Sequence, residues 1–303
     1  MIPKVTVIGS VNLDITIQTN KFPNIGETII ADQVSRFAGG KGANQAVAAK
    51  RLGADVTFIG TFGDDEPGNF LIDTLKKENI DLTFSQITKY RNTGTAYIIS
   101  SNGDNLIIVD SGANQYITCD YINSIENILQ QSDIILLQLE IPLNTVWHIC
   151  NLSYQYNIPV ILNPAPSAII PKEILQKVSA ITPNEHEILE IIHSDYQVHC
   201  IENVFDLLKE KIIMTNGQHG VLYYQNNTIQ SQPAYQVNVS DTTGAGDVFN
   251  GALATFWHQG LEEAVTLANA AASLSVTKLG AQSGSPTYQE LKYFLHQYRY
   301  SNG

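Results

Sequence analysis

The chain has 303 residues, of which 44% are hydrophobic and 15% charged, so it contains enough apolar side chains for a large core and lacks the composition of a disordered protein. Its net charge of −12 argues against a nucleic-acid surface, which requires a basic patch, but not against binding of a small phosphate compound. Three isolated cysteines without metal or disulfide spacing, and an N-terminal apolar run too short for a signal peptide or a membrane span, predict a cytoplasmic protein that binds no membrane.

Buried strands alternate with helices along most of the chain. Strand patterns occupy 5–9, 56–60, 134–140, 160–162 and 211–215, and helices are expected at 45–53, 68–78, 143–156, 184–192, 247–254, 261–276 and 286–298, with 278–284 as a loop. A hairpin is expected over 221–232, across Asn226-Asn227. This order predicts a single α/β domain over 1–303, a three-layer α/β/α sandwich around a mostly parallel sheet.

Two strand-rich segments interrupt the alternation. They span about 12–37 and 93–112, the second with a hairpin-like turn at 101–104. We expect them to form a small β-sheet that stands off the main body as a lid. Such a lid would exclude water from a reacting phosphate.

Polar side chains follow two of the buried strands. Asn12 and Asp14 come after the first strand, spaced two apart, so both could face one side and bind hydroxyl groups, although such a pair is more often a solvated turn. Glu140 ends the strand at 134–140. Because ligands of open α/β sheets lie beyond the carboxyl ends of the strands, all three are candidates for a binding site.

A glycine-rich turn at 39–44 leads into an alanine-rich helix. Its glycines allow the backbone to approach a ligand closely, and Asn44 falls in the first helical turn. Further along, Asn184 and Glu187 are three residues apart and therefore neighbours on one face of the expected helix. In each case the alternative is an ordinary structural turn.

The most informative stretch is the one from Asp241 to Asp247, which reads DTTGAGD. A Gly-Ala-Gly turn running into a helix offers unpaired amide groups to an anion. If that anion is a phosphoryl group in transfer, Asp247 can take the proton of the attacking hydroxyl. The alternative is an ordinary helix start with an aspartate in its first turn.

Three more familiar motifs are excluded. Residues 244–249 have Phe249 where a dinucleotide fingerprint needs its third glycine, and Gly40-Lys41 is followed by glycine rather than the Ser or Thr of a Walker A loop. His186-Glu187 lacks the second histidine of a zinc-protease helix.

Taken together, the motifs resemble the ribokinase branch of the PfkB, or ribokinase-like, family of carbohydrate kinases. The resemblance covers nearly the whole chain and rests on the segments at 9–14, 39–46, 163–166, 182–185, 241–247 and 280–282. It implies ATP-dependent phosphorylation of the 5-hydroxyl of D-ribose, with Mg²⁺ and an activating K⁺ ion.

The resemblance also implies a role for each matching position. The sugar would be held by Asn12, Asp14, Gly40, Lys41, Asn44 and Glu140, with Asp247 as the general base and Gly244, Ala245 and Gly246 as the anion hole. The ATP site would include Asn184, Thr215, Gly217, Gly220, Gly246 and Asn269, with Glu187 positioning Mg²⁺ through water. The K⁺ site would include Asp241, Thr243, Ser275, Lys278, Gly280 and Gly284, where glycine lacks the hydroxyl of the serine that can occur in ribokinases.

Other readings remain open at this stage. A sister kinase could act on deoxyribose, fructose or a nucleoside, because one substrate hydroxyl contributes only a few kcal/mol. A non-catalytic sugar-binding relative or a scaffolding protein is disfavoured by the presence of Asp247 and the glycine-rich turns. We also expect a homodimer in which the edges of the lid strands pair with another copy.

Overall fold

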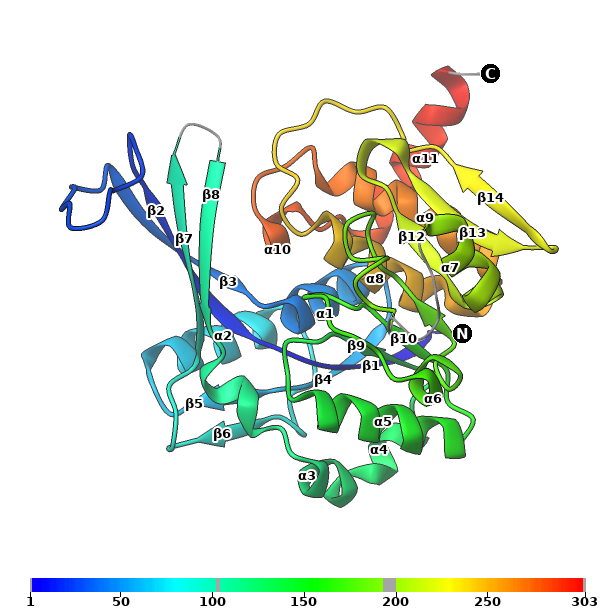
Figure 1. Ribbon diagram of the computed structural model, residues 1–303, viewed down its shortest axis with the longest axis horizontal. Coiled ribbons are helices and arrows are strands. Elements are labelled where there is room, and N and C mark those ends of the chain that lie inside the picture. The colour runs from blue at the N-terminus through cyan, green and yellow to red at the C-terminus, as the bar shows by residue number, and fades with distance from the viewer. Residues whose placement is uncertain (1, 102–103, 193–199, 302–303) are drawn as a thin grey trace.

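A parallel sheet forms the centre of the protein (Figure 1). The computed structural model describes residues 2–101, 104–192 and 200–301. The strands are β1 (Lys4–Ile8), β4 (Asp55–Ile59), β9 (Ile134–Leu137), β10 (Val160–Leu162) and β11 (Ala180–Ile181), in the order β11-β10-β9-β1-β4. All four pairings are parallel, which places every carboxyl end on the same edge and confirms the predicted architecture.

An antiparallel hairpin continues this sheet beyond β11. A parallel bridge joins Ile181 to Ile212, next to β12 (Ile213–Thr215). β12 pairs with β13 (Val221–Gln225), which pairs in turn with β14 (Thr228–Gln232). The predicted hairpin turn is confirmed, since Asn226 and Asn227 have φ of 53° and 63°, the left-handed conformation that a tight hairpin turn requires.

Helices cover both faces of the sheet, and strand alternation divides the apolar side chains between two cores. Val5 and Val7 of β1 face one core, and Ile8 faces the other. The first core is covered by α1 (Lys41–Arg51), α2 (Glu66–Lys77), α8 (Ala245–Phe256), α9 (Leu261–Ser275) and α11 (Tyr288–Ser301). The second is covered by α3 (Cys119–Ser124), α4 (Glu126–Gln130), α5 (Leu143–Gln155), α6 (Lys172–Leu175) and α7 (Ile201–Leu208). Among the described residues, no helix is long and apolar enough to cross a membrane.

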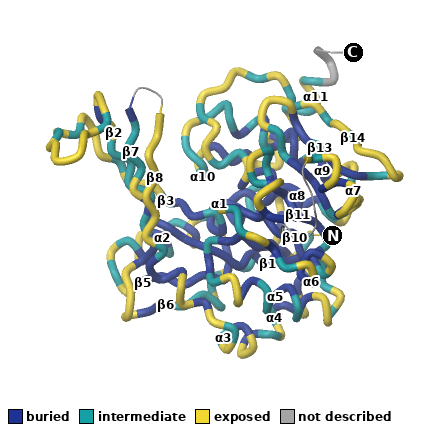
Figure 2. The backbone as a smooth tube through the Cα atoms, viewed as in Figure 1, coloured by how far each residue is buried: buried dark blue, intermediate teal, exposed yellow. Residues whose placement is uncertain are grey.

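The second sheet projects from this body, as Figure 1 shows. It contains β2 (Asn12–Gln18), β3 (Gln33–Gly39), β7 (Gly94–Ser101) and β8 (Asp104–Asp110), in the order β3-β2-β7-β8, with β2 and β7 parallel and the outer pairs antiparallel. The predicted turn at 101–104 includes residues 102–103, which lie outside the described residues. Every residue of β8 is exposed (Figure 2). Two short strands, β5 (Thr61–Gly63) and β6 (Gln86–Thr88), form a separate parallel pair.

Two local predictions are wrong. The expected helix at 184–192 is a series of turns, because its helix-type hydrogen bonds are isolated ones: the Ile188 amide donates to the Asn184 carbonyl and the Ile191 amide to the Glu187 carbonyl, both at 3.1 Å. The expected loop at 278–284 contains a short helix, α10 (Ala281–Gly284). It begins after Gly280, whose φ of 83° reverses the chain, and is closed by the Gly284 amide, which donates to the Gly280 carbonyl at 2.8 Å.

Candidate functional site

The start of α1 lies against the carboxyl end of β1. This close approach requires glycine, because a Cβ on Gly42 would lie 2.8 Å from the backbone of Gly9. Gly40 has a φ of 90° and turns the chain into the helix. Lys41 and Asn44 therefore begin a helix that points into the sheet edge where α/β proteins bind ligands.

Polar groups at this edge hold one another in place. Glu140 accepts hydrogen bonds from the Ser10 hydroxyl and, at 3.2 Å, from the backbone amide of Lys41. Asn12 accepts a hydrogen bond of 2.7 Å from the side chain of Asn114, which itself accepts one from the Val11 amide at 3.0 Å. The site residues predicted after β1 and β9 are thus brought together with the start of α1.

Asp247 lies in the first turn of α8 and is only 8% exposed. Its two carboxylate oxygens accept hydrogen bonds of 3.0 Å, one from the side-chain amide of Asn44 and one from that of Gln45. Gly244 precedes the helix in the left-handed conformation, with a φ of 76°, and no side chain caps the helix. Next to Asp247, a Cβ placed on Gly246 would meet nothing within 4 Å, so the backbone there is open to a ligand.

Charges are concentrated around this carboxylate. Burial, together with the charges of Glu140 and Asp247, raises the pKa of Asp14 from 3.8 to about 7. Burial alone would lower the pKa of Lys41, but the surrounding carboxylates, led by Asp247 and Glu140, raise it overall. Burial raises the pKa of Asp247, against the effects of Lys41 and of its two amide donors. The charges of four carboxylates act on Lys41: those of Asp247, Glu140, Glu187 and Asp14.

The residues predicted for the nucleotide gather at the end of β12 and in the neighbouring turn. Asn184 and Glu187 exchange hydrogen bonds: the Asn184 amide donates to the Glu187 carboxylate at 3.0 Å, and the Glu187 amide donates to the Asn184 side chain at 2.9 Å. They are neighbours, as predicted, although the helix is absent. Burial raises the pKa of Glu187, whose charge also acts on Lys41, so this region faces the cluster around Asp247.

The other residues of this set differ in how open they are. Gly217 and Gly220 have φ of 49° and 92° and shape the turn after β12. A Cβ on Gly217 would meet only the Glu185 carboxylate, at 3.8 Å. Asn269 is buried in α9 and donates to the carbonyl of Pro233 at 2.8 Å, so its amide nitrogen is already engaged in the protein.

The six residues predicted for K⁺ lie around the segment that follows α9. Asp241 accepts hydrogen bonds from the amides of Thr243 at 2.9 Å and Gly280 at 2.8 Å, and these bonds lower its pKa although burial opposes them. A Cβ on Gly284 would lie 3.0 Å from the carbonyl oxygen of Ser275 and 3.8 Å from that of Lys278. The Lys278 ammonium is bound to Glu290 at 2.6 Å and is held by that partner. The carbonyl oxygens of Ser275 and Lys278 therefore both lie on the side of Gly284 where a side chain would be.

Several residues of the site were not predicted. Gln45 and Asn114 contact Asp247 and Asn12, and Gln282 donates from α10 to the Asn44 side chain at 3.0 Å. Gln45 directly follows Asn44, a predicted site residue, so its position next to that motif could have indicated it. Asn114 and Gln282 are separated from their partners by 102 and 238 residues, and nothing local marks them.

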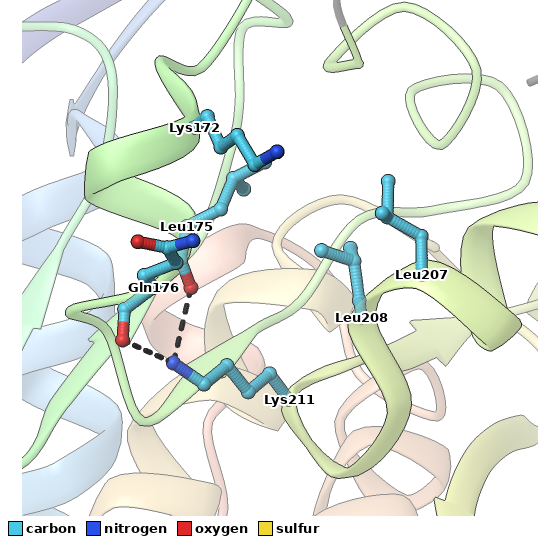
Figure 3. A pocket seen from close by; sticks show the side chains of 6 residues that line it. All are labelled: Lys172, Leu175, Gln176, Leu207, Leu208 and Lys211. Carbon is cyan, nitrogen blue, oxygen red and sulfur yellow. Dashed lines mark hydrogen bonds between the residues drawn. The ribbon is translucent and has the colours of Figure 1, made fainter. Parts of the chain in front are cut away.

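A pocket elsewhere on the surface has a different character. It lies between α6 and the end of α7 and is lined by Lys172, Leu175, Gln176, Leu207, Leu208 and Lys211 (Figure 3). The Lys211 ammonium donates to the carbonyls of Leu175 and Gln176 at the end of α6. Such a contact caps a helix C-terminus, and none of the predicted site residues lines this pocket.

Comparisons with known proteins identify relatives of the chain. The chain is 40% identical to a ribokinase of Bacillus subtilis, over 96% of this chain and 99% of that one. It is 34% identical to a deoxyribokinase of Salmonella typhi, over 96% and 98%. Its fold matches the structure of a ribokinase of Arabidopsis thaliana complexed with ribose and ATP, with a TM-score of 0.87, 30% identity and coverage of 97% and 99%. A sequence profile of pfkB family carbohydrate kinases matches residues 2–288, and the chain therefore belongs to the pfkB family of carbohydrate kinases.

Proposed function

We propose that this kinase transfers the γ-phosphoryl group of ATP to the 5-hydroxyl of D-ribose, giving D-ribose 5-phosphate and ADP. The observation that carries the proposal is the position of Asp247, a buried carboxylate at an uncapped helix N-terminus, within a cluster that contains Lys41 and Asp14. The family membership and the full-length similarity to ribokinases support the same reaction.

In the proposed reaction, Asp247 accepts the proton of the 5-hydroxyl while that oxygen forms a bond to the γ-phosphorus. The bond between the γ-phosphorus and the bridging oxygen breaks, and ADP leaves with the electron pair. Amide groups of Gly244, Ala245 and Gly246 would stabilise the negative charge that develops on the phosphoryl oxygens. Ala245 also donates to the Thr242 carbonyl at 3.2 Å, so its share in this anion hole is the smallest.

The sugar would be bound by side chains with complementary hydrogen-bonding groups. Asn12 and Asn44 can donate to and accept from hydroxyls, Asp14 and Glu140 accept, and Lys41 donates. Gly40 contributes its backbone, since a Cβ there would lie 2.7 Å from the Val11 Cα. Because Asp14 and Lys41 lie within the electrostatic reach of Asp247, a sugar held by them would present a hydroxyl to that carboxylate.

The nucleotide would lie across the turns after β12, contacting Asn184, Thr215, Gly217, Gly220 and Asn269. The residues fit a magnesium ion bound through water, because Glu187 is a partly buried carboxylate beside the nucleotide region. Mg²⁺ would neutralise charge on the ATP phosphates. The chain's own part is to hold Glu187 in place, which the reciprocal hydrogen bonds with Asn184 accomplish.

The carbonyls near Gly284 fit an activating potassium ion. Ser275 and Lys278 supply two of them, and Asp241 fixes the segment through Thr243 and Gly280. K⁺ would supply a fixed positive charge beside the anion hole. Gly284 has no side chain that could bind the ion, so it would contribute only its backbone carbonyl.

ADP release tests these assignments. Ribose, deoxyribose, fructose and adenosine would each be supplied with ATP and Mg²⁺, in buffers that contain either potassium or sodium. We expect the highest kcat/KM for ribose and higher turnover in potassium. Preference for deoxyribose would favour the second candidate, to which the 34% identity with a deoxyribokinase points. Turnover of none of the four would refute the proposed reaction.

We also propose that the lid sheet closes over the sugar and joins two copies of the chain. The outer strand β8 carries Leu106, Ile107, Ile108 and Val109, which are 48–65% exposed in the single chain. An exposed edge strand of this kind is suited to cover by a second copy. Light scattering should show a dimer, and Ile107→Lys with Ile108→Lys should weaken it. A monomer at working concentration for the unsubstituted protein would contradict this arrangement.

A further inference from the structure

A chain of buried amide side chains passes behind the Asp247 carboxylate. Gln45 is fully buried, and its side-chain nitrogen donates to Asp247 at 3.0 Å and to the Asn163 oxygen at 3.1 Å. Its oxygen accepts a hydrogen bond of 2.6 Å from the Gln138 nitrogen. Both amide hydrogens of Gln45 and its oxygen are therefore engaged, which leaves the side chain a single orientation.

Two groups that can only accept, the Thr182 carbonyl and the Asp247 carboxylate, fix the direction of these hydrogen bonds. The Thr182 carbonyl can only accept, so Asn163 must turn its nitrogen toward it, at 3.1 Å, and its oxygen toward Gln45. Gln45 must then present its nitrogen to Asn163, and the same nitrogen reaches Asp247. A reversed Gln45 would bring its oxygen against the carboxylate, where two acceptors would face each other.

The chain of contacts also returns to the residue before Asp247. The Thr182 hydroxyl bonds to the Asn250 oxygen at 2.6 Å, and the Asn250 nitrogen donates to the Gly246 carbonyl at 2.8 Å. A ring of polar contacts thus closes around the first turn of α8. It runs from Asp247 through Gln45, Asn163, Thr182 and Asn250 to the Gly246 carbonyl, and Gln138, which follows β9, joins it as a branch at Gln45. The ring holds both the Asp247 side chain and the neighbouring backbone.

One atom of this arrangement is left without a partner. The side-chain oxygen of Gln138 is buried and has no hydrogen bond among the described residues. Buried polar atoms are normally paired, so such an exception needs an explanation. Here the Gln138 nitrogen is directed to Gln45, and that orientation supports the donor that Gln45 presents to Asp247.

We propose that Gln45 is a positioning residue of the phosphoryl-transfer site, one that fixes the Asp247 carboxylate and keeps it ready to accept the hydroxyl proton. The inference rests on the proposed function in one respect, which is that the proton comes from a hydroxyl of the sugar. Asn44 differs in role, because it is itself a predicted sugar ligand and bonds to Gln282. Gln45 is fully buried and reaches the site only through Asp247.

A hydrogen bond donated to a carboxylate favours its ionised form. Loss of Gln45 as a donor should therefore raise the pKa of Asp247 further, in the same direction as burial. Since a protonated Asp247 cannot accept the hydroxyl proton, the acid limb of the pH profile of kcat should move to higher pH. A residue that only packed α1 against the sheet would leave that limb where it is.

The test compares Gln45→Met, which keeps the volume and removes the donor, with Thr255→Val. Thr255 is also buried between α8 and α1, donating to Gly251 at 2.8 Å and Ala49 at 3.4 Å, without contacting Asp247. The carboxyl ¹³C titration of Asp247, assigned by Asp247→Asn, should shift to higher pH in Gln45→Met and stay unchanged in Thr255→Val. In parallel, kcat should fall about 10- to 100-fold in Gln45→Met, as expected for a misplaced catalytic group.

An unchanged Asp247 titration in a folded Gln45→Met would overturn the inference, even if activity fell. If that variant does not fold, Gln45→Leu also removes the donor without adding a charge, and the same upward shift of the Asp247 titration is required. The titration needs no substrate, so it decides the role of Gln45 even if the wild-type protein phosphorylates none of the four sugars. In that case the proposed function is refuted, and the titration of Asp247 still decides the role of Gln45.

Discussion

Replacing Asp14 with asparagine should stabilise the protein, and more so at alkaline pH. In the folded protein the pKa of Asp14 is raised from 3.8 to about 7 by burial and by the charges of Glu140 and Asp247. The carboxylate packs against the backbone of Gly39, where a Cβ would overlap it. The folded state therefore resists ionisation of this side chain, while the unfolded chain ionises it in acid.

The sign and size of the effect follow from proton linkage. Between pH 5 and pH 7 the folded protein keeps the Asp14 proton that the unfolded chain has lost, so the free energy of unfolding falls by about 1.4 kcal/mol per pH unit. The contribution of the Asp14 proton to the free energy of unfolding is complete below the pKa that Asp14 has in the unfolded chain, and it is lost above pH 7. Because asparagine does not titrate, the stability advantage of Asp14→Asn should grow by about 3 kcal/mol from pH 5 to pH 8.

Urea denaturation at pH 5, 6, 7 and 8 measures this difference. Asp73→Asn is the matched control, since Asp73 is exposed on α2. A constant difference between Asp14→Asn and the unsubstituted protein would refute the reasoning. Asp14→Asn should also raise the KM for the sugar, because the carboxylate that destabilises the folded protein is the group proposed to bind a sugar hydroxyl.

Two further substitutions test other parts of the structure. Asp247→Asn should lower kcat roughly 10²- to 10⁴-fold while nearly keeping the sugar KM, as expected for a lost general base, and steady-state kinetics with near-normal turnover would remove Asp247 from that role. Gly251→Ala should lower the free energy of unfolding by about 1–3 kcal/mol, because the new Cβ would lie 2.6 Å from the Gln45 carbonyl and 2.7 Å from the Ala48 Cβ. Denaturation that shows no loss of stability would mean that α1 and α8 can separate at that point.

The parallel sheet could be predicted because it depends on local patterns. Apolar runs ending in glycine, asparagine or glutamate identified β1, β9 and β10, and all parallel strands end at one edge. Asp247 followed from a glycine-rich turn before a helix, a signal contained in seven residues. The absence of a regular helix at 184–192 could not be predicted, since Asn184 and Glu187 have the spacing of a helix start and exchange the hydrogen bonds typical of one.

The ring behind Asp247 was missed for a related reason. Gln138, Asn163 and Thr182 each follow a buried strand, as Glu140 does, so the position of a polar residue after a strand was available as a signal. What could not be read from the sequence is which of them meet, because Gln45 lies 118 residues from Asn163 and 202 from Asp247. Such distant pairings are fixed only by the order of strands in the sheet.

The helix α1 connects the parts of the proposed site. Its first turn carries Lys41, Asn44 and Gln45 to the sugar region and to Asp247. Its last residue, Arg51, donates to the carbonyls of Gln282 at 2.6 Å and Ser285 at 3.0 Å, around the segment predicted to bind K⁺.

Small residues allow α1 to make both connections. The helix is buried from Gly42 to Ala49, and its alanines pack against α8, which bears the base. Because a packed helix moves as one body, displacement of the segment that Arg51 holds would also act on Asn44 and Gln45. The alanine-rich composition of α1 therefore has a structural reason: bulkier side chains would separate Asp247 from Asn44 and Gln45, which donate to it.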